Sequence, residues 1–395
     1  MGAAPEYLAL LVGRFDGDVI DLPRGKARIR LQTGDETAWD VLINSDGAKL
    51  QKAATEERAD ALLQADEATW KQMAEDIRGG MDAFRQGRLR IRHDMHLGVG
   101  FLAATSGNTA PGRLTFNRQR TRKGTISYLE AGQGYPVILL HGLGGTKASF
   151  LPTVSALADS YRMIAMDHLG FGESDKPIGA PYDAAFFAEA ATALMDELEI
   201  DKAHVVGNSM GGRVALELGF RHHDRINRIG LLSPSLAWKR QRPWLNAVKL
   251  ARPELGLLQI TPRGPTENIV RRLVPGGMEG WAAVGLDEFL RSYLTPRGRA
   301  AFYAAARQIY LEEPHGPNGF WTRLRELERE TLFVWGKHDK LVPIRFARHV
   351  EAAVPHAKHV ELNCGHVPQM EAPKETHRAL KSFLKSATVP AAMSA

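Results

Sequence analysis

Short strand-like runs alternate with helical patterns through the C-terminal two thirds of the chain. Each run is rich in β-forming residues and precedes a loop that contains Gly, His or Asp. Amphipathic patterns such as 184–198 and 210–220 separate most of the runs. This alternation predicts an α/β fold with a doubly wound, mostly parallel sheet, whose functional loops follow the carboxyl ends of the strands. The predicted strands are 136–140, 162–166, 203–206, 226–232, 331–335 and 358–362.

The alternation stops after Leu232 and gives way to helical, aromatic sequence interrupted by Pro and Gly. We expect this segment to insert a helical lid at 233–325. Residues 236–311 carry twelve Lys and Arg against five Asp and Glu, an excess that accounts for the net charge of +6. Such a surface either is simply solvated or contacts an anionic membrane, and no nucleic-acid motif accompanies it. Trp238 and Trp281 are candidate substrate contacts in this segment.

A polar segment broken by Gly and Pro, residues 104–112, separates this part from a different N-terminal one. Such segments are typical of domain boundaries. We therefore predict a smaller N-terminal α+β domain at 1–105, a linker at 106–112, the sheet domain at 113–386 and a tail after it, at 387–395.

The N-terminal part shows the pattern of a small sheet covered by helices. Residues 27–31 and 39–43 alternate in polarity on either side of a Gly-Asp turn, which predicts an antiparallel hairpin. Asp66 is the predicted N-cap of a helix that includes Trp70. The other expected elements are a strand near 58–63, a short helix at 81–86 and a strand at 88–92.

Residues 8–104 resemble the sterol carrier protein-2 lipid-binding domain, mainly through the order of 59–63, the helix around Trp70 and 82–91. The resemblance implies a helix-covered antiparallel sheet with an apolar tunnel for acyl chains or sterols. We expect the domain to deliver an acyl chain across a flexible linker. The alternative is that it only covers an apolar face of the sheet domain or builds an oligomer. The candidate tunnel-lining side chains, each with an ordinary core position as its alternative, are Trp70, Met73, Ile77, Phe84 and Met95.

Gly207-Asn208-Ser209-Met210-Gly211 follows a Val-rich run and opens a helical pattern. A Gly-x-Ser-x-Gly in that context is typical of a nucleophile elbow, in which a tight turn holds the serine in a strained conformation. The pentapeptide alone also fits a plain glycine-rich turn. We take Ser209 as the candidate nucleophile.

A serine hydroxyl needs a base, and the base needs an orienting acid. On this type of fold the chain order is serine, acid, histidine. Asp339 follows the penultimate predicted strand, and His366 follows the last one. His338 is a rival base, but it shares a loop with the acid and precedes it. All three residues at strand ends and in the expected order predict a Ser209–Asp339–His366 triad.

An oxyanion hole requires two converging amide groups. The N–H of Met210, directly after the nucleophile, is the first candidate. The second is the N–H of Leu143 in the small-residue loop that begins at His141. We expect the His141 imidazole to brace this loop.

Together these loops resemble the α/β-hydrolase superfamily over residues 113–386. The resemblance extends to residues 167–175 and implies a structural role for Asp167. It implies a serine carboxylester hydrolase acting on acyl or lipid-like esters, because Val367 stands where meta-cleavage-product C–C hydrolases usually carry an aromatic residue. A C–C bond hydrolase, and a lipid carrier with an accessory hydrolase domain, are the alternatives.

Composition narrows the setting of this activity. The single cysteine, Cys364, excludes an internal disulfide and a cysteine-rich metal site. No apolar run reaches the roughly 18 residues of a membrane helix, and no secretory signal is evident. We expect a cytoplasmic enzyme that needs no metal or organic cofactor and binds a small-molecule ester or acyl lipid; its oligomeric state is left open.

Overall fold

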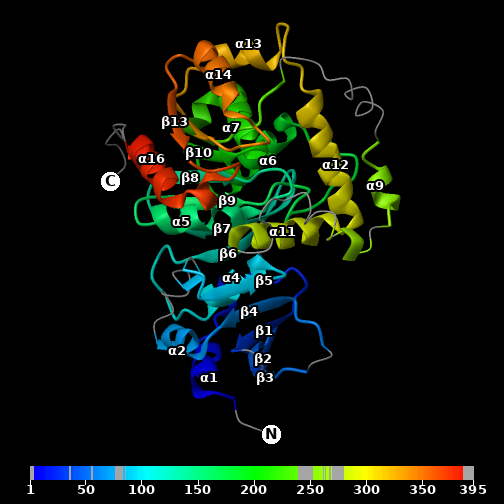
Figure 1. The fold of residues 1–395 in the computed structure, drawn as a ribbon, viewed down its shortest axis with the longest axis vertical. Helices are drawn as coiled ribbons and strands as arrows, with labels where there is room; N and C mark the ends of the chain where they lie inside the picture. The colour runs from blue at the N-terminus through cyan, green and yellow to red at the C-terminus, as the bar shows by residue number, and fades with distance from the viewer. Residues whose placement is uncertain are drawn as a thin grey trace.

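The molecule consists of two bodies stacked end to end, each built on its own sheet (Figure 1). The smaller body ends with α4 (Met95–Ala104), and the larger one begins with β6 (Thr115–Thr121). No helix within the described part of the chain is long and apolar enough to cross a membrane. This computed structural model describes residues 4–34, 37–54, 57–75, 83–84, 86–238, 252–260, 262, 264–266, 268 and 280–385, with 280–284 as backbone only.

The sheet of the smaller body has the order β3-β2-β1-β4-β5. The predicted hairpin is confirmed as β1 and β2, which pair antiparallel with Ile29 opposite Val41. β1 also pairs with β4 in parallel, so the sheet is mixed and the expected all-antiparallel sheet is wrong at this pair. Sequence reasoning missed β3, which pairs antiparallel with β2. After β3 the chain must return to the other end of the sheet before β4 begins, so β4 runs parallel to β1. The strands are β1 (Ala27–Thr33), β2 (Thr37–Asn44), β3 (Gly47–Lys52), β4 (Ala61–Ala65) and β5 (Leu89–Arg92).

Helices cover one face of this sheet. In α2 (Glu67–Glu75) the Thr69 N–H donates to Asp66 Oδ1 at 2.7 Å, which confirms the predicted N-cap. α1 (Glu6–Gly13) packs beside α2. Of the helix predicted at 81–86, residues 83 and 84 are helical, while 81, 82 and 85 lie outside the described residues.

The larger body holds an eight-stranded sheet of order β13-β12-β11-β10-β8-β9-β7-β6. All six predicted strands are confirmed, and the pairs among them are parallel. β6 and β7, an antiparallel pair at one edge, escaped sequence reasoning because polar residues fill most of β6. The further strands are β7 (Gly124–Ala131), β8 (Pro136–Leu140), β9 (Arg162–Met166), β10 (Ala203–Asn208), β11 (Ile226–Leu232), β12 (Thr331–Gly336) and β13 (Lys358–Leu362).

Helices cover both faces of this sheet. Within β8, Val137 and Leu139 join the hydrophobic cluster of α5 (Leu151–Leu157) and α16 (Pro373–Lys385). Ile138 and Leu140 point the other way, into the cluster of α6 (Ala184–Glu197) and α7 (Met210–Arg221). Burial on both faces explains why this strand has a continuous apolar sequence.

The two bodies share a hydrophobic cluster, because α4 packs its buried residues against β6. His96 of α4 meets Phe116 of β6 edge-on, with ring centroids 5.1 Å apart. Across the segment predicted as a flexible linker, Arg113 donates to Asp16 at 2.7 Å, and Arg118 donates to Asp21 at 2.9 Å. The smaller body is therefore docked on the larger one, as the alternative interpretation expected.

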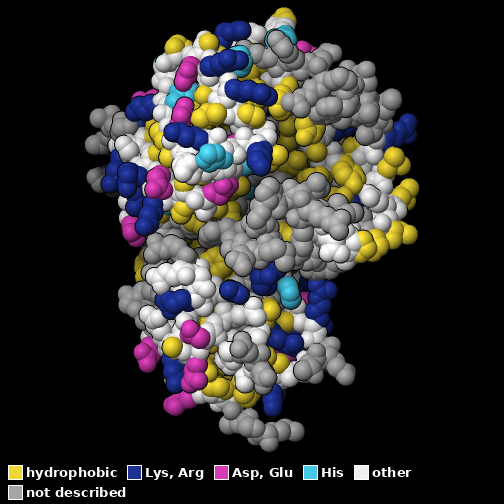
Figure 2. Space-filling model, viewed as in Figure 1, with side chains coloured by type: hydrophobic (Ala, Val, Ile, Leu, Met, Phe, Trp, Pro, Cys, Tyr) yellow, Lys and Arg dark blue, Asp and Glu magenta, His cyan; other side chains and the backbone are white. Residues whose placement is uncertain are grey.

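The insertion, defined as residues 233–330 between β11 and β12, spans the larger body beside this junction (Figure 1). Where it meets the smaller body, a cavity of about 470 Å³ is bordered by charged side chains such as Arg24 and Lys176. Figure 2 shows Lys and Arg side chains with one histidine gathered where the bodies meet. Within the described residues of the insertion, the helices are α9 (Leu255–Leu258), α11 (Gly280–Tyr293), α12 (Pro296–Leu311) and α13 (Phe320–Arg325).

Candidate active site

Ser209 stands between the end of β10 and the first residue of α7. Its backbone torsions are φ 53° and ψ −117°, a conformation that non-glycine residues rarely adopt. A side chain at Gly211 would collide with the carbonyl oxygen of Leu140, so only glycine allows this close approach. The strained turn expected of a nucleophile elbow is present, and Ser209 keeps part of its surface exposed.

Asp339 and His366 lie after β12 and β13, two adjacent parallel strands, and so meet at the same sheet edge. Nδ1 of His366 lies 2.7 Å from Asp339 Oδ2. Burial favours the neutral acid, but the hydrogen bond and charge of His366 hold the pKa of Asp339 below its usual value. Because the carboxylate is ionised, Nδ1 carries the hydrogen and Nε2 is left as the basic nitrogen.

His338, the rival base, is held elsewhere. Its Nε2 donates to Asn363 Oδ1 at 2.7 Å. His366 is instead paired with Asp339, which is the oriented geometry that a base requires.

The loop with the predicted oxyanion donor Leu143, residues 141–146 and called the oxyanion loop from here on, lies directly beside Ser209. A Cβ placed on Gly142 would be 3.1 Å from the Cβ of Ser209. The N–H of Gly145 donates to the Gly142 carbonyl at 3.0 Å and closes a tight turn, in which Gly144 has a φ of 73°. The predicted oxyanion donors, Leu143 and Met210, thus belong to the two segments that border Ser209.

Buried groups brace the oxyanion loop from below. Nε2 of His141 accepts the His168 N–H at 3.0 Å, and burial lowers the pKa of His141 so that its ring stays neutral. Next to the loop, the buried Lys147 ammonium donates to Asp167 at 2.7 Å. The bracing role expected of His141 and the structural role expected of Asp167 agree with these contacts.

Two residues that sequence reasoning missed hold the loop of His366. Glu371 accepts the N–H groups of Gly365 at 2.6 Å and Val367 at 2.8 Å. Asn208, next to the nucleophile, donates to the His366 carbonyl at 3.0 Å. Asn208 lies within the elbow motif that marked Ser209, but nothing in the local pattern marked Glu371.

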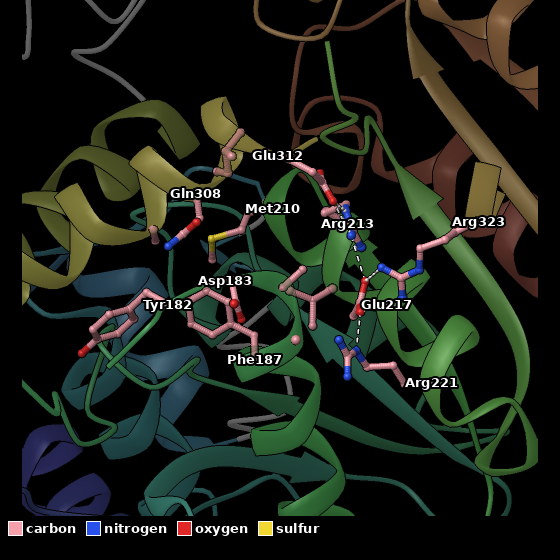
Figure 3. Close-up of a pocket in the computed structure, with 15 residues that line it drawn as sticks. Tyr182, Asp183, Phe187, Met210, Arg213, Glu217, Arg221, Gln308, Glu312 and Arg323 are labelled. Carbon is pink, nitrogen blue, oxygen red and sulfur yellow. Dashed lines mark hydrogen bonds and ion pairs between the residues drawn. The ribbon is translucent and has the colours of Figure 1, made fainter. Parts of the chain in front are cut away.

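A cavity of about 200 Å³ opens beside Met210, between α6, α7 and α12. Figure 3 shows Tyr182 and Phe187 with Met210 at one end of it. At the other end Glu217 pairs with three arginines, which lower its pKa to about 2 although the carboxylate is buried. Met210 directly follows Ser209 in the sequence, so the apolar end of this cavity lies at the start of α7.

The other predicted contact residues lie in different surroundings. Trp238 packs edge-on against Phe346 with ring centroids 5.1 Å apart, and the side chain of Trp281 lies outside the described residues. Trp70 has no exposed surface, so it borders no cavity that admits water, while Phe84 is partly buried. Of the further tunnel candidates, Met73 and Met95 are buried, and Ile77 is outside the described residues. A lipid-binding role for any of them stays a prediction.

Comparisons with known families match both bodies. Residues 135–252 match the family described as the alpha/beta hydrolase fold. Residues 21–104 match the SCP-2 sterol transfer family. These matches agree with both resemblances drawn from the sequence.

Individual relatives are more specific. The 2-hydroxy-6-oxo-6-phenylhexa-2,4-dienoate hydrolase of Comamonas testosteroni is 31% identical over 280 residues, 66% of this chain and 91% of the relative. The 2-hydroxymuconate semialdehyde hydrolase of Pseudomonas sp. strain CF600 is 30% identical, covering 66% and 91%. Among solved structures, a bacterial membrane phospholipase A is 26% identical with a TM-score of 0.55, covering 69% of this chain and 86% of that one. The meta-cleavage product hydrolase of Pseudomonas fluorescens IP01 is 25% identical with a TM-score of 0.56, covering 69% and 98%.

Proposed function

Since the chain belongs to the α/β-hydrolase family, we propose that it hydrolyses a C–C bond beside a ketone in a 2-hydroxy-6-oxo-2,4-dienoate. The similarity to dienoate hydrolases over nine tenths of their length carries this proposal. Ester hydrolysis, the main sequence-based hypothesis, uses the same groups but has weaker support from the relatives.

The chemistry starts at Ser209. Its Oγ adds to the C6 carbonyl while Nε2 of His366 takes the hydroxyl proton, and Asp339 stabilises the imidazolium that forms. The amides of Leu143 and Met210 hold the oxyanion.

Collapse of the adduct breaks the bond between C5 and C6. In the ketonised substrate the released electron pair delocalises along the carbon chain to the C2 oxygen, so the leaving fragment is a stabilised dienolate. His366 returns the proton to this fragment. A water molecule, deprotonated by the same His366, then hydrolyses the acyl group from Ser209.

A second candidate is hydrolysis of acyl esters. Val367 replaces the aromatic residue expected after the histidine of C–C hydrolases, and a membrane phospholipase A is among the similar solved structures. In that case each added methylene should contribute up to about 0.8 kcal/mol of binding free energy. The value of kcat/KM should then rise with acyl length until the apolar end of the cavity is filled.

The test compares both substrate classes on the full chain. We expect a higher kcat/KM on 2-hydroxy-6-oxo-6-phenylhexa-2,4-dienoate than on p-nitrophenyl esters from acetate to decanoate. The first reaction is followed by the loss of the absorbance of the conjugated substrate. Preference for the esters would favour the second candidate. In both cases Ser209→Ala should lower kcat by about 10⁴ to 10⁶. An active Ser209→Ala variant would refute both candidates.

A further inference from the structure

α11, a helix of the insertion, connects the N-terminal body to the oxyanion loop through three consecutive residues, 287, 288 and 289. The first of them, Asp287, is buried and faces the N-terminal body. Its carboxylate accepts from Arg92 Nε at 2.7 Å and Arg92 Nη2 at 3.2 Å, and from the His93 N–H at 3.1 Å. A two-pronged arginine–carboxylate pair of this kind fixes orientation as well as distance.

Glu288 contacts both partners at once. One carboxylate oxygen accepts the Met95 N–H at 2.8 Å, in the first turn of α4. The other accepts the hydroxyl of Thr146 at 2.9 Å, at the end of the oxyanion loop. Arg291 of the same helix also donates to this oxygen at 2.9 Å. Because Glu288 is buried, with 2% of its surface exposed, losing one of these donors would leave a polar group unsatisfied.

Phe289 completes the connection. A Cβ at Gly144 would lie 2.7 Å from its ring, so Phe289 covers the turn that presents Leu143. Phe302 of α12 packs edge-on against Phe289, with centroids 5.3 Å apart, and its ring lies 3.3 Å from the same Cβ position at Gly144. The oxyanion loop therefore rests against α11 along its outer side.

The burial of α4 argues that the N-terminal domain is fixed rather than mobile, because α4 belongs to the cluster that continues into the larger body. Trp70, a candidate tunnel residue, has no exposed surface, so no open cavity reaches it. A carrier that moves an acyl chain towards Ser209 needs both mobility and an open cavity. A domain that braces its neighbour needs neither.

We propose that the N-terminal domain is a positioning element of the active site, which holds the oxyanion loop against Ser209 through Asp287 and Glu288 of α11. The inference rests on the proposed function, because it takes the Leu143 amide as an oxyanion donor. It differs from lipid delivery in one measurable respect. A misplaced oxyanion donor slows every substrate, whereas lost delivery slows only the poorly soluble ones.

The test uses the full chain with Asp287→Asn and Glu288→Ala. Asp21→Asn is the matched control, because it neutralises another carboxylate that pairs with an arginine across the same junction but does not touch α11. The readouts are kcat and KM on a short ester (p-nitrophenyl acetate) and a long one (p-nitrophenyl decanoate), the rate at which a fluorophosphonate labels Ser209, and Tm. The phosphonate reports on the oxyanion hole whatever the natural substrate is.

We expect both α11 variants to lower kcat and the labelling rate by about 10- to 100-fold, part of the 10²- to 10³-fold cost of losing one oxyanion donor. KM and the ratio of short-chain to long-chain activity should stay the same, and Asp21→Asn should behave like the wild type. Thr146→Val combined with Glu288→Ala should be no slower than the slower single variant, because both substitutions remove the same hydrogen bond between Thr146 and Glu288.

Normal labelling of a folded Glu288→Ala would overturn the inference, as would an equal loss in Asp21→Asn or a loss confined to long substrates. Asp287→Asn keeps the shape of its side chain and decides the question if Glu288→Ala does not fold. Wild-type protein that is not labelled at Ser209 would instead refute the proposed function, and the inference with it.

Discussion

Replacing Asp339 by asparagine should move the imidazole hydrogen of His366 from Nδ1 to Nε2 and leave the fold unchanged. Oδ1 of Asp339 accepts the N–H groups of Leu341 and Val342, both at 2.8 Å. Those two donors require an oxygen, so the new NH₂ group must take the place of Oδ2, which faces His366 Nδ1 at 2.7 Å. Two donors cannot share one hydrogen bond. The imidazole therefore moves its hydrogen to Nε2, where it blocks removal of the Ser209 proton.

The expected cost is about 10⁴ in kcat, as when a triad histidine is held in the wrong tautomer. This corresponds to about 5.5 kcal/mol in the activation barrier. The measurements are kcat on the preferred substrate and the fluorophosphonate labelling rate, with Tm to show that Asp339→Asn is folded. His338→Gln is the control, because it removes the rival base and should leave both rates unchanged.

A loss smaller than tenfold in Asp339→Asn would mean that the pair of His366 and Asp339 does not generate the nucleophile. A loss in His338→Gln of the size expected for Asp339→Asn would transfer the role of base to His338.

Two further predictions concern stability. Burial between Tyr135 and Tyr161 lowers the pKa of His204 to about 4, so only the unfolded chain takes up its proton between pH 6.5 and 4. The free energy of unfolding should therefore fall with decreasing pH across this window, and this residue contributes up to about 1.4 kcal/mol per pH unit. Urea titrations at several pH values should show a shallower fall in His204→Phe. A fall equal to that of the wild type would contradict this. Gly211→Ala should destabilise the protein by about 1–3 kcal/mol or more, because its Cβ would collide with the chain beside the elbow. Gly285→Ala, at an exposed position of α11 with nothing within 4 Å, should not lower the Tm, because alanine is favoured over glycine inside a helix. An undiminished Tm in Gly211→Ala as well would show that the elbow is not tightly packed.

The groups that we propose carry the chemistry could be predicted from local patterns. Ser209 and Asp339 each follow a strand that a hydrophobic run marks clearly. His366 follows β13, where only Val360 and Leu362 are apolar. Parallel strands present their carboxyl ends at one edge. The same patterns predicted six strands of the larger sheet. They missed β6 because an edge strand has few buried residues and so little periodic signal.

Contacts between distant segments were beyond such patterns. Glu288 meets Thr146 across 142 positions of sequence and Met95 across 193, and no local rule says which carboxylate will satisfy which donor. The position of Glu371 around the His366 loop depends on how that loop turns back.

The N-terminal domain shows the physical limit most clearly. An apolar helix such as α4 carries the same sequence pattern whether it will cover a bound lipid or a neighbouring sheet, because either removes its surface from water. Folding placed β6 against α4 and the carboxylate of Glu288 at its first turn. The sequence determines that the residues of α4 are buried. Which surface buries them, a bound lipid or a neighbouring sheet, depends on the packing of the whole molecule.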